Sequence, residues 1–555
     1  MTFAKKVLIL NKWEYVVPAL AVASLLISCI LVSEKKFFWN DELYSYYLLA
    51  DPSFTHMLGA FHDKINNTPP LYFILGWLWA RAFGATELSL RLFSSLGMCI
   101  ACVTVWVTLG RTYNFWSAAI GTLSVFCTSE LILGQNAEAR MYGLFLAVCS
   151  LALFQFDKNH TSSKDSWSIC LTNYCIHTAI VHTHILGLFY SGAILISQIV
   201  TDKYFNSRFR PKLYLSIVFS WVSIILYIPS FLNQADAGNP RTWIPIPFLK
   251  DLIALLTFPP TSFLKLVVLP LLILFIALRL FINKTDKNAS SLRQLQIQQN
   301  YYTEKYLLIF AYAFLAVPVL IWIISQTVKP IFVNRYMIPT AISWPILLTY
   351  LYSRIFYNSI FDDRRIYNNS IKAKFLAAQR PIILLALTAI LLVYPIIYAN
   401  ILPKEQLPGL NDNKYGDQNL PIVVQSSHAF LQRLQYSPER NRYFFILDWQ
   451  AAVDNSSGLF TPQEYKHMEA LKRNYPELFH NITKSETFIK KYNRFLVLDS
   501  VDYKKQCTLE PLWENISCPR WLEMRILNNP DYKVKDIGKI ELEDRKMLLI
   551  EKVKK

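Results

Sequence analysis

The stretch from Tyr15 to Glu42 reads YVVPALAVASLLISCILVSEKKFFWNDE, a long apolar run followed by a short polar segment that ends in two acids. The apolar part, at about 14–33, has the length of a helix that crosses the roughly 30 Å hydrocarbon core of a bilayer. It is longer than a signal-peptide core, and no clear cleavage site of small residues follows it. We therefore expect a retained first membrane helix, with Asp41 and Glu42 just beyond its end.

The whole chain is apolar for its length: of 555 residues, 53% are hydrophobic and 15% are aromatic. Apolar runs of about 20 residues recur through the first ~400 positions, and most lack the polar face of a soluble helix. The net charge of +17 lies mainly in short segments between these runs. That pattern is typical of the positive-inside bias rather than of a nucleic-acid surface. We expect an α-helical multi-pass membrane protein with membrane lipid, and no nucleic acid, as a partner.

The charges between the apolar runs predict the topology. Lys5 and Lys6 place the N-terminus in the cytoplasm, so the first helix leads to an external segment at 34–70. The next apolar stretch, 71–84, is short and Trp-rich; if it lies in the interface without crossing, every later basic loop faces inward. We expect about 11 spans in the cell membrane, near 14–33, 88–110, 115–134, 140–156, 168–183, 185–200, 213–231, 262–282, 306–326, 337–352 and 381–400.

The tail differs from the rest of the chain in composition. We divide the sequence into a membrane domain at 1–400 and an extracytoplasmic domain at 401–555. In the tail, strand-like runs alternate with helical stretches, which predicts a small α/β domain. The expected strands are Pro421–Gln425, Tyr443–Leu447, Phe495–Leu498 and Met547–Val553, and the expected helices include Ser427–Leu434 and Pro462–Leu471. Cys507 and Cys518 either pair as a disulfide or remain two free thiols.

The predicted topology places Asp41 and Glu42 at the outer membrane surface. Ionisable groups close to a membrane usually have a function or a partner. Adjacent residues on a helix point about 100° apart, so only one of the two acids can point at a reacting atom. The other then orients a neighbouring side chain or the loop. The alternative is a charge pair at a helix N-terminus that follows Asn40 as a cap.

Two further outer segments carry charges just before a helix. In the first, QNAEARMY at 135–142, the candidates are Glu138 and Arg140, and the alternative is a structural ion pair. In the second, KPIFVNRY at 329–336, Lys329, Arg335 and Tyr336 precede a helix N-terminus, an arrangement that suits a phosphate. The alternative for these cations is snorkelling to the membrane interface.

A fourth outer segment adds Arg241 and Trp243, and the tryptophan either stacks on a sugar or anchors at the interface. His182 and His184 also fall near the outer face. A metal site needs a third ligand, and the sequence singles out none. We therefore expect neither a metal nor a cofactor.

Acids and cations from separate loops thus converge on one membrane face. A carboxylate there can accept the proton of an acceptor hydroxyl as general base. Arg, Lys and Tyr donors can stabilise a phosphate leaving group, and an apolar groove between helices can hold a lipid tail. The combination predicts transfer of a group from a membrane-bound phosphate carrier.

Four motifs, in order, resemble those of the GT-C glycosyltransferases, and specifically the protein O-mannosyltransferase and aminoarabinose transferase superfamily. They are WNDE at 39–42, TPPLYF at 68–73, QNAEARMY at 135–142 and NRYMIP at 334–339. The resemblance implies the GT-C fold over about 1–400, with polyprenyl-phosphate-linked sugars as donors. It also implies an inverting, metal-independent transfer in which Asp41 is the catalytic carboxylate and Tyr336, with Arg335, meets the carrier phosphate.

The chain departs from the aminoarabinose transferases at three positions. Tyr44 and Thr68 replace an Arg and a Lys, and Glu138 stands where those enzymes have an Asp. These changes argue against the aminoarabinose reaction and leave the donor class standing. A transporter or flippase for lipid-linked saccharides is the alternative, although it should place charges near mid-membrane; a scaffold that displays the tail is another. The sugar and the acceptor, whether lipid, glycan or protein, stay open.

Overall fold

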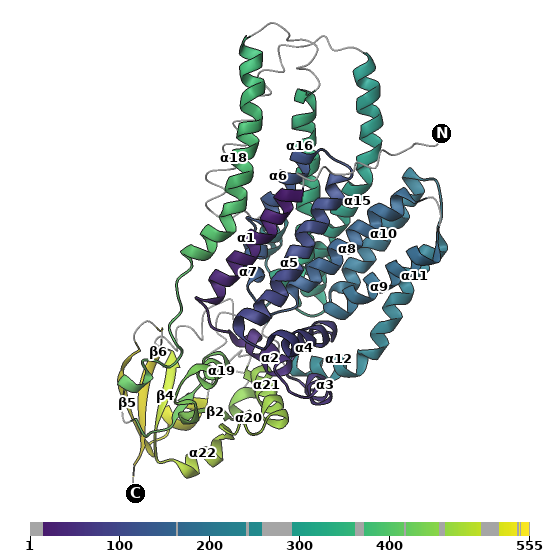
Figure 1. Cartoon of the computed structure of the whole chain (residues 1–555). Coiled ribbons are helices and arrows are strands. Elements are labelled where there is room, and N and C mark those ends of the chain that lie inside the picture. The colour runs from purple at the N-terminus through teal and green to yellow at the C-terminus, as the bar shows by residue number, and fades with distance from the viewer. Residues whose placement is uncertain are drawn as a thin grey trace. The chain divides into compact units, whose positions relative to one another are not determined.

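The computed structural model describes residues 15–162, 165–239, 244–257, 291–360, 371–415, 418–453, 461–500, 521–540, 543 and 545–553. Its backbone contacts divide the chain into two compact units (Figure 1). The helical unit comprises Met1–Glu34, Leu88–Ile224 and Pro247–Pro403. The loop–tail unit comprises Lys35–Glu87, Ile225–Ile246 and Lys404–Lys555. The segment that carries Asp41 therefore forms one unit with the polar tail, although more than 300 residues separate them in the sequence.

The helical unit consists of apolar helices that pack along one another, among them α6 on α16, α1 on α18, and α10 on α15. Its elements are α1 (Val16–Ser33), α5 (Glu87–Gly110), α6 (Phe115–Phe126), α7 (Glu130–Asn136), α8 (Tyr142–Thr161), α9 (Trp167–Thr183), α10 (Gly187–Phe205), α11 (Pro211–Val222), η2 (Ser223–Leu226), α13 (Leu249–Leu256), α15 (Ser291–Thr327), η4 (Asn334–Ile342), α16 (Ser343–Ile360) and α18 (Ile371–Ile401).

Four of the described helices are long and apolar enough to cross a membrane, with mean hydropathy between 2.0 and 2.7. They are Val16–Ser33, Glu87–Gly110, Glu304–Thr327 and Ile382–Ile401, and Pro211–Leu226 with Ile228–Gly238 makes a fifth if that broken pair is one span. The protein is therefore a membrane protein, as expected. These four helices coincide with four of the predicted spans. The predicted span at 262–282 lies outside the described residues, and the expected total of about 11 stays a prediction.

Besides the broken pair, which includes the span expected at 213–231, two of the predicted spans are interrupted in the structure. The span expected at 115–134 is divided into α6 and α7, and the Thr128 hydroxyl at the break donates to the Ser124 carbonyl. Ser and Thr side chains compete for backbone groups in this way and end helices. The span expected at 337–352 begins as the 3-10 helix η4, which is kinked at Met337 and contains Pro339. Proline lacks the N–H that a regular α-helix needs.

Two glycines allow α5 and α8 to approach closely. A Cβ atom on Gly143 would lie 1.9 Å from the Ser94 carbonyl oxygen, and one on Gly97 would lie 2.3 Å from the Gly143 carbonyl carbon. Small residues at helix crossings permit such backbone contact in membranes, where packing rather than the hydrophobic effect holds helices together. The crossing fixes the start of α8, and with it the residues just before that helix.

The tail folds as an α/β domain around a six-stranded sheet of order β3-β2-β1-β4-β6-β5, as the alternating pattern predicts. Strands β3, β2, β1 and β4 are parallel, and β6 and β5 join β4 as an antiparallel pair. The strands are β1 (Ile422–Val424), β2 (Tyr443–Leu447), β3 (Ile482–Lys484), β4 (Arg494–Ser500), β5 (Tyr532–Lys539) and β6 (Arg545–Lys552). The four strands expected from the sequence are confirmed as β1, β2, β4 and β6. Strands β3 and β5 were not expected, because β3 is only three residues long and β5 is rich in charge.

Helices of the tail cover this sheet, and the loop segments join them. The tail helices are α19 (Ser427–Tyr436), α20 (Trp449–Val453), α21 (Thr461–Asn474) and α22 (Ser485–Lys491), with the short η5 (Asp412–Lys414), η6 (Arg440–Arg442) and η9 (Glu523–Leu527). The loop segments contribute α2 (Asn40–Leu49), α3 (Phe54–His62), α4 (Leu71–Phe83), α12 (Ile228–Ala235) and η3 (Asp236–Gly238). Helix α19 packs on α2, and α21 packs on η3.

Helix α4 is the short Trp-rich stretch expected at 71–84. Its 13 residues extend about 20 Å, less than the roughly 30 Å of a hydrocarbon core. Trp77 Nε1 donates to the Asp51 carbonyl at 2.8 Å, and Arg81 donates to the Ala50 carbonyl at 3.1 Å. Helix α4 is thus bonded to the end of α2 within its own unit.

The close contact at Gly143 predicts that two glycine-to-alanine substitutions differ in their effect on stability. Gly143→Ala should lower the stability of the protein by about 1–3 kcal/mol, because the added methyl group has no space against α5. Gly192→Ala in α10 is the matched control, because nothing lies within 4 Å of its added Cβ, and it should be neutral or stabilising by up to about 1 kcal/mol. Thermal unfolding in detergent measures both variants. Equal midpoints for the two would show that the α5–α8 contact is not tight.

Candidate functional site

The turn between α7 and α8 carries Glu138 and Arg140, and three hydrogen bonds hold it against α1 and α5. Asn136 Nδ2 donates to the Leu25 carbonyl at 2.9 Å, and its Oδ1 accepts from the Ser95 hydroxyl at 2.9 Å. The Ser94 hydroxyl donates to the Arg140 carbonyl at 2.8 Å. Arg140 is buried in this turn, and Glu138 is half-buried. The polar residues of the motif at 135–142 therefore fix its backbone.

The helical unit brings the third and fourth sequence motifs, QNAEARMY and NRYMIP, together. Arg335 Nε, on η4, donates to the Tyr142 hydroxyl at 3.0 Å. The ring of Tyr336 stacks on that of Tyr142 with centroids 6.4 Å apart, and it lies 5.1 Å from the ring of His184. The Arg335 guanidinium lies 5.7 Å from the Tyr336 ring centroid. We call Arg140, Tyr142, His184, Arg335 and Tyr336 the cationic cluster.

His184 enters this cluster from the break between α9 and α10. Its Nδ1 accepts the Leu186 N–H at 3.1 Å, so a neutral ring carries its proton on Nε2. The ring also stacks on Phe145, with centroids 5.0 Å apart and planes 14° apart. The sequence indicated His184 only as a metal ligand without companions. Among the described residues, no group of three His, Cys, Asp or Glu is arranged to hold a metal.

The cationic cluster combines two guanidinium groups with two phenol groups. Such groups are the usual donors to a phosphate, and they strengthen as charge develops on it. The cluster is thus suited to an anionic ligand. Lys329, predicted to act with Arg335, lies instead on the exposed turn that follows α15. Arg241 and Trp243 lie outside the described residues.

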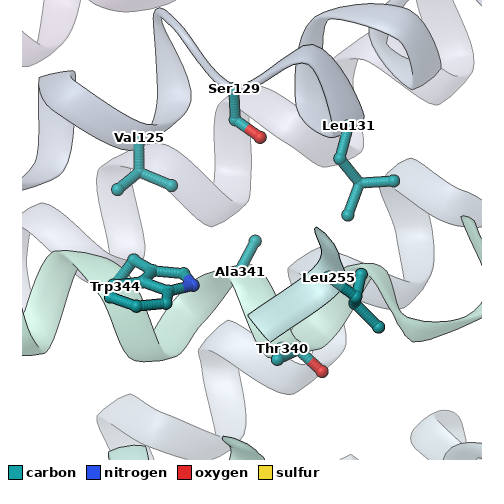
Figure 2. Close-up of a pocket in the computed structure, with 7 residues that line it drawn as sticks. All are labelled: Val125, Ser129, Leu131, Leu255, Thr340, Ala341 and Trp344. Atoms are coloured by element: carbon teal, nitrogen blue, oxygen red, sulfur yellow. The ribbon is translucent and has the colours of Figure 1, made fainter. Parts of the chain in front are cut away.

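A pocket lies beside η4 in the same unit, and Figure 2 shows its lining. It encloses about 280 Å³, including its open side. Most of the lining is apolar, and the side chains come from α6, α7, α13, η4, α16 and the residue before α7: Val125, Ser129, Leu131, Leu255, Thr340, Ala341 and Trp344. Because Thr340 and Arg335 share η4, the pocket lies on the order of 10 Å along that helix from the cationic cluster.

The loop–tail unit holds the two acids at the start of α2. Glu42 is buried, and its Oε2 accepts the Trp39 N–H at 3.2 Å, as an acid in the third position of a helix does in a capping box. Asp41 is half-buried in the second position, where the helix dipole favours a carboxylate. Glu42 therefore orients the first turn of α2, and the catalytic role of Asp41 stays a prediction.

Two residues of the tail that the sequence did not indicate lie close to this first turn. Glu464 and His467, both on α21, face the side of α2 that bears Tyr44. The ring of His467 lies 5.3 Å from that of Tyr44. One signal was present: Glu464 shares the buried helical stripe of Met468 and Leu471, at intervals of four and three residues. An acid at such a position is uncommon.

Comparison with family models and with curated proteins finds no match. The backbone is similar to that of ArnT from Cupriavidus metallidurans in two crystal structures. The structure bound to undecaprenyl phosphate matches with a TM-score of 0.53 and 11% identity over 97% of this chain and 98% of that chain. The apo structure matches with a TM-score of 0.54 and 11% identity over 97% of each chain. The chain has the GT-C fold.

The GT-C fold that the four motifs implied is therefore confirmed over nearly the whole chain, tail included. Because only 11% of aligned residues are identical, the likeness is one of fold, and the chemistry is argued from this chain's own residues. AglB, an oligosaccharyltransferase from Archaeoglobus fulgidus, aligns with a TM-score of 0.44 and 12% identity over 89% of this chain and 70% of that chain.

Burial of Glu464 predicts a pH-dependent stability. Burial raises the pKa of Glu464 from 4.5 to about 7. The protonated form is thus favoured in the folded state, and folding stability falls as pH rises from 4.5 to 7, by about 3 kcal/mol in all. Glu464→Gln keeps an oxygen for the Ser427 N–H and should remove this fall. Thermal unfolding of the full chain between pH 4 and 8 measures it, with exposed Glu477→Gln as the control. Parallel profiles for wild type and Glu464→Gln would contradict the assignment.

Proposed function

We propose that this protein is a glycosyltransferase that moves a sugar from a polyprenyl-phosphate carrier to an acceptor at the outer face of the cell membrane. One observation carries the proposal: nearly the whole chain shares its fold with ArnT, a protein that has been crystallised with undecaprenyl phosphate. Fold alone does not determine activity. The argument therefore rests equally on whether this chain supplies a phosphate site, an apolar pocket and a base.

The cationic cluster is the phosphate site in this proposal. Arg335 and Arg140 neutralise the phosphate of the carrier, and the Tyr142 and Tyr336 hydroxyls donate to its oxygens. These donors stabilise the charge that the departing carrier phosphate gains as the bond to the sugar breaks. The apolar side chains that line the pocket beside η4 contact the first part of the lipid tail. Further contacts to the sugar or the phosphate are assigned to Lys329, Arg241 and Trp243.

Asp41 is the general base. Its carboxylate takes the proton of the acceptor hydroxyl as the oxygen attacks the anomeric carbon from the face opposite the phosphate, so the configuration inverts. Glu42 holds the first turn of α2 through its bond to the Trp39 N–H. Glu138, in the turn beside Arg140, acts as a second acid that orients the cationic cluster. Neither a metal nor a cofactor takes part.

The proposed topology has an inner N-terminus, about 11 spans and an outer tail. Helix α4 lies in the interface, which its 13-residue length and its bonds to Asp51 and Ala50 support. All acids and cations named above then reach the same leaflet. Membrane domain 1–400 and tail 401–555 remain the proposed division in sequence.

Substitution of the base tests the activity. Asp41→Asn keeps the shape of the side chain and removes its proton acceptor, so turnover should fall by about 10²–10⁴-fold with donor binding unchanged. The assay follows release of undecaprenyl phosphate from a panel of undecaprenyl-phosphate pentoses and hexoses, with envelope lipid, glycan and protein fractions as acceptors. Full turnover in Asp41→Asn would refute the role of this carboxylate. Absence of turnover by the wild type on every donor would refute the donor class.

Reporter fusions test the topology. Enzyme reporters that are active only outside the cytoplasm, fused after Asp63 and after Gly84, should both be active, because α4 does not cross. Fusion after Arg111, between α5 and α6, is the internal control and should be inactive. Opposite signals at Asp63 and Gly84 would mean that α4 spans the membrane and that every later segment changes side.

A further inference from the structure

Charged contacts fasten α21 of the tail to the loop segments of the same unit. Arg473 makes a two-pronged pair with Asp63, from Nε and Nη2 at 2.9 Å each, and Asn474 Nδ2 donates to the same carboxylate at 2.8 Å. Two turns earlier on the helix, Lys466 contacts the Asp236 carboxylate at 3.0 Å, and Lys64 contacts the same carboxylate at 2.7 Å. These cations hold the pKa of the Asp236 carboxyl well below its usual value. One helix of the tail therefore bonds to two separate loop segments.

His467 is the residue of α21 whose ring packs against Tyr44 of α2. Its Nδ1 donates to the Lys64 carbonyl, and because a carbonyl can only accept, this bond fixes the proton on Nδ1. Gln463 Nε2 donates to the other ring nitrogen at 3.4 Å. Burial lowers the pKa of His467, and the negative charge of Asp41 partly offsets that effect. The ring is thus neutral, oriented at both nitrogens, and within electrostatic reach of Asp41.

Tyr44 joins α2 to the same helix. It is buried against the His467 ring, whose centroid lies 5.3 Å from that of Tyr44. Asn40 and Ser427 lie near its hydroxyl, and Glu464 Oε1 accepts the Ser427 N–H at 2.6 Å. Asn40 immediately precedes Asp41. The first turn of α2 and α21 thus share one set of buried side chains around Tyr44.

We propose that α21 is the positioning element for Asp41, with His467 as its principal positioning residue, so that the tail supplies part of the active site. This inference rests on the proposed function, since positioning matters only if Asp41 acts as a base. His467 does not exchange a proton with substrate; it fixes the Lys64 carbonyl and the Tyr44 ring, and these fix the first turn of α2. Glu464 supports the arrangement through Ser427.

Positioning of this kind affects turnover more than donor affinity. The donor phosphate binds to the cationic cluster of the other unit, whereas the placement of Asp41 determines how often the acceptor oxygen is deprotonated in the right geometry. A misplacement of about 1 Å can cost up to 10²-fold in rate. Loss of a contact that only stabilises the fold would instead lower the amount of active protein and leave kcat per folded molecule unchanged.

The first test changes His467. His467→Phe keeps the ring against Tyr44 and removes the donor to Lys64, so we expect kcat to fall roughly tenfold to a hundredfold with donor KM unchanged. His467→Gln retains an N–H donor and should recover most of kcat. His480→Phe is the matched control, because His480 also bonds to a carbonyl, that of Glu477 at 3.0 Å, but is exposed. Wild-type kcat in His467→Phe would overturn the proposal.

The second test holds even if His467→Phe fails to fold, because it uses an ion pair in which Arg473 is 58% exposed. Asp63→Arg should detach α21 from the loop, lower kcat and speed amide hydrogen exchange at 60–68. Asp63→Arg with Arg473→Asp restores the pair with reversed sign and should recover both readouts. Faster exchange together with unchanged kcat would overturn the proposal. If the wild type transfers no sugar while exchange responds as described, the proposed function fails and the docking of α21 stands as a separate result.

Discussion

The approach of α5 to α8 is the constraint on which the cationic cluster depends. With no side chain at Gly97 or Gly143, the two backbones touch, and the Ser94 carbonyl occupies the space of a missing Cβ. This contact sets where α8 begins. The turn that precedes α8 is then held by Asn136, and its arginine is buried against the bundle. Tyr142, the first residue of α8, can therefore meet Arg335 from a segment almost 200 positions away.

The two units hold their charged side chains in different ways. In the helical unit, the guanidinium and phenol groups of the cationic cluster contact one another, because unpaired charge among apolar helices is costly. In the loop–tail unit, salt bridges such as Asp63–Arg473 and Asp236–Lys466 join partly exposed side chains.

Local sequence patterns were sufficient to predict many of the helices and strands. Hydropathy predicted α1, α5, α15 and α18, and strand propensity predicted β1, β2, β4 and β6, since each depends on residues within one window. The helix breaks near Thr128 and Pro339 were not predicted. The sequence alone does not show whether a threonine side chain or a proline will interrupt an apolar helix at that point. Glu464 and His467 were missed for a different reason: their partners lie in a segment about 400 positions earlier, and one sequence contains no sign of that pairing. Arg335 and Tyr336 lie beside Tyr142 of the motif at 135–142, whereas Lys329 lies on an exposed turn.

The contact of α21 with the loop segment Lys35–Glu87 has a consequence for the synthesis of the protein. His467 and Lys64 are 403 positions apart. At about 5–20 residues per second, the ribosome therefore adds His467 roughly 20–80 s after Lys64. During that interval the loop has left the ribosome without the helix that orders it. A truncated or still-growing chain would therefore lack the contacts of α21 with this loop until that helix has been synthesised.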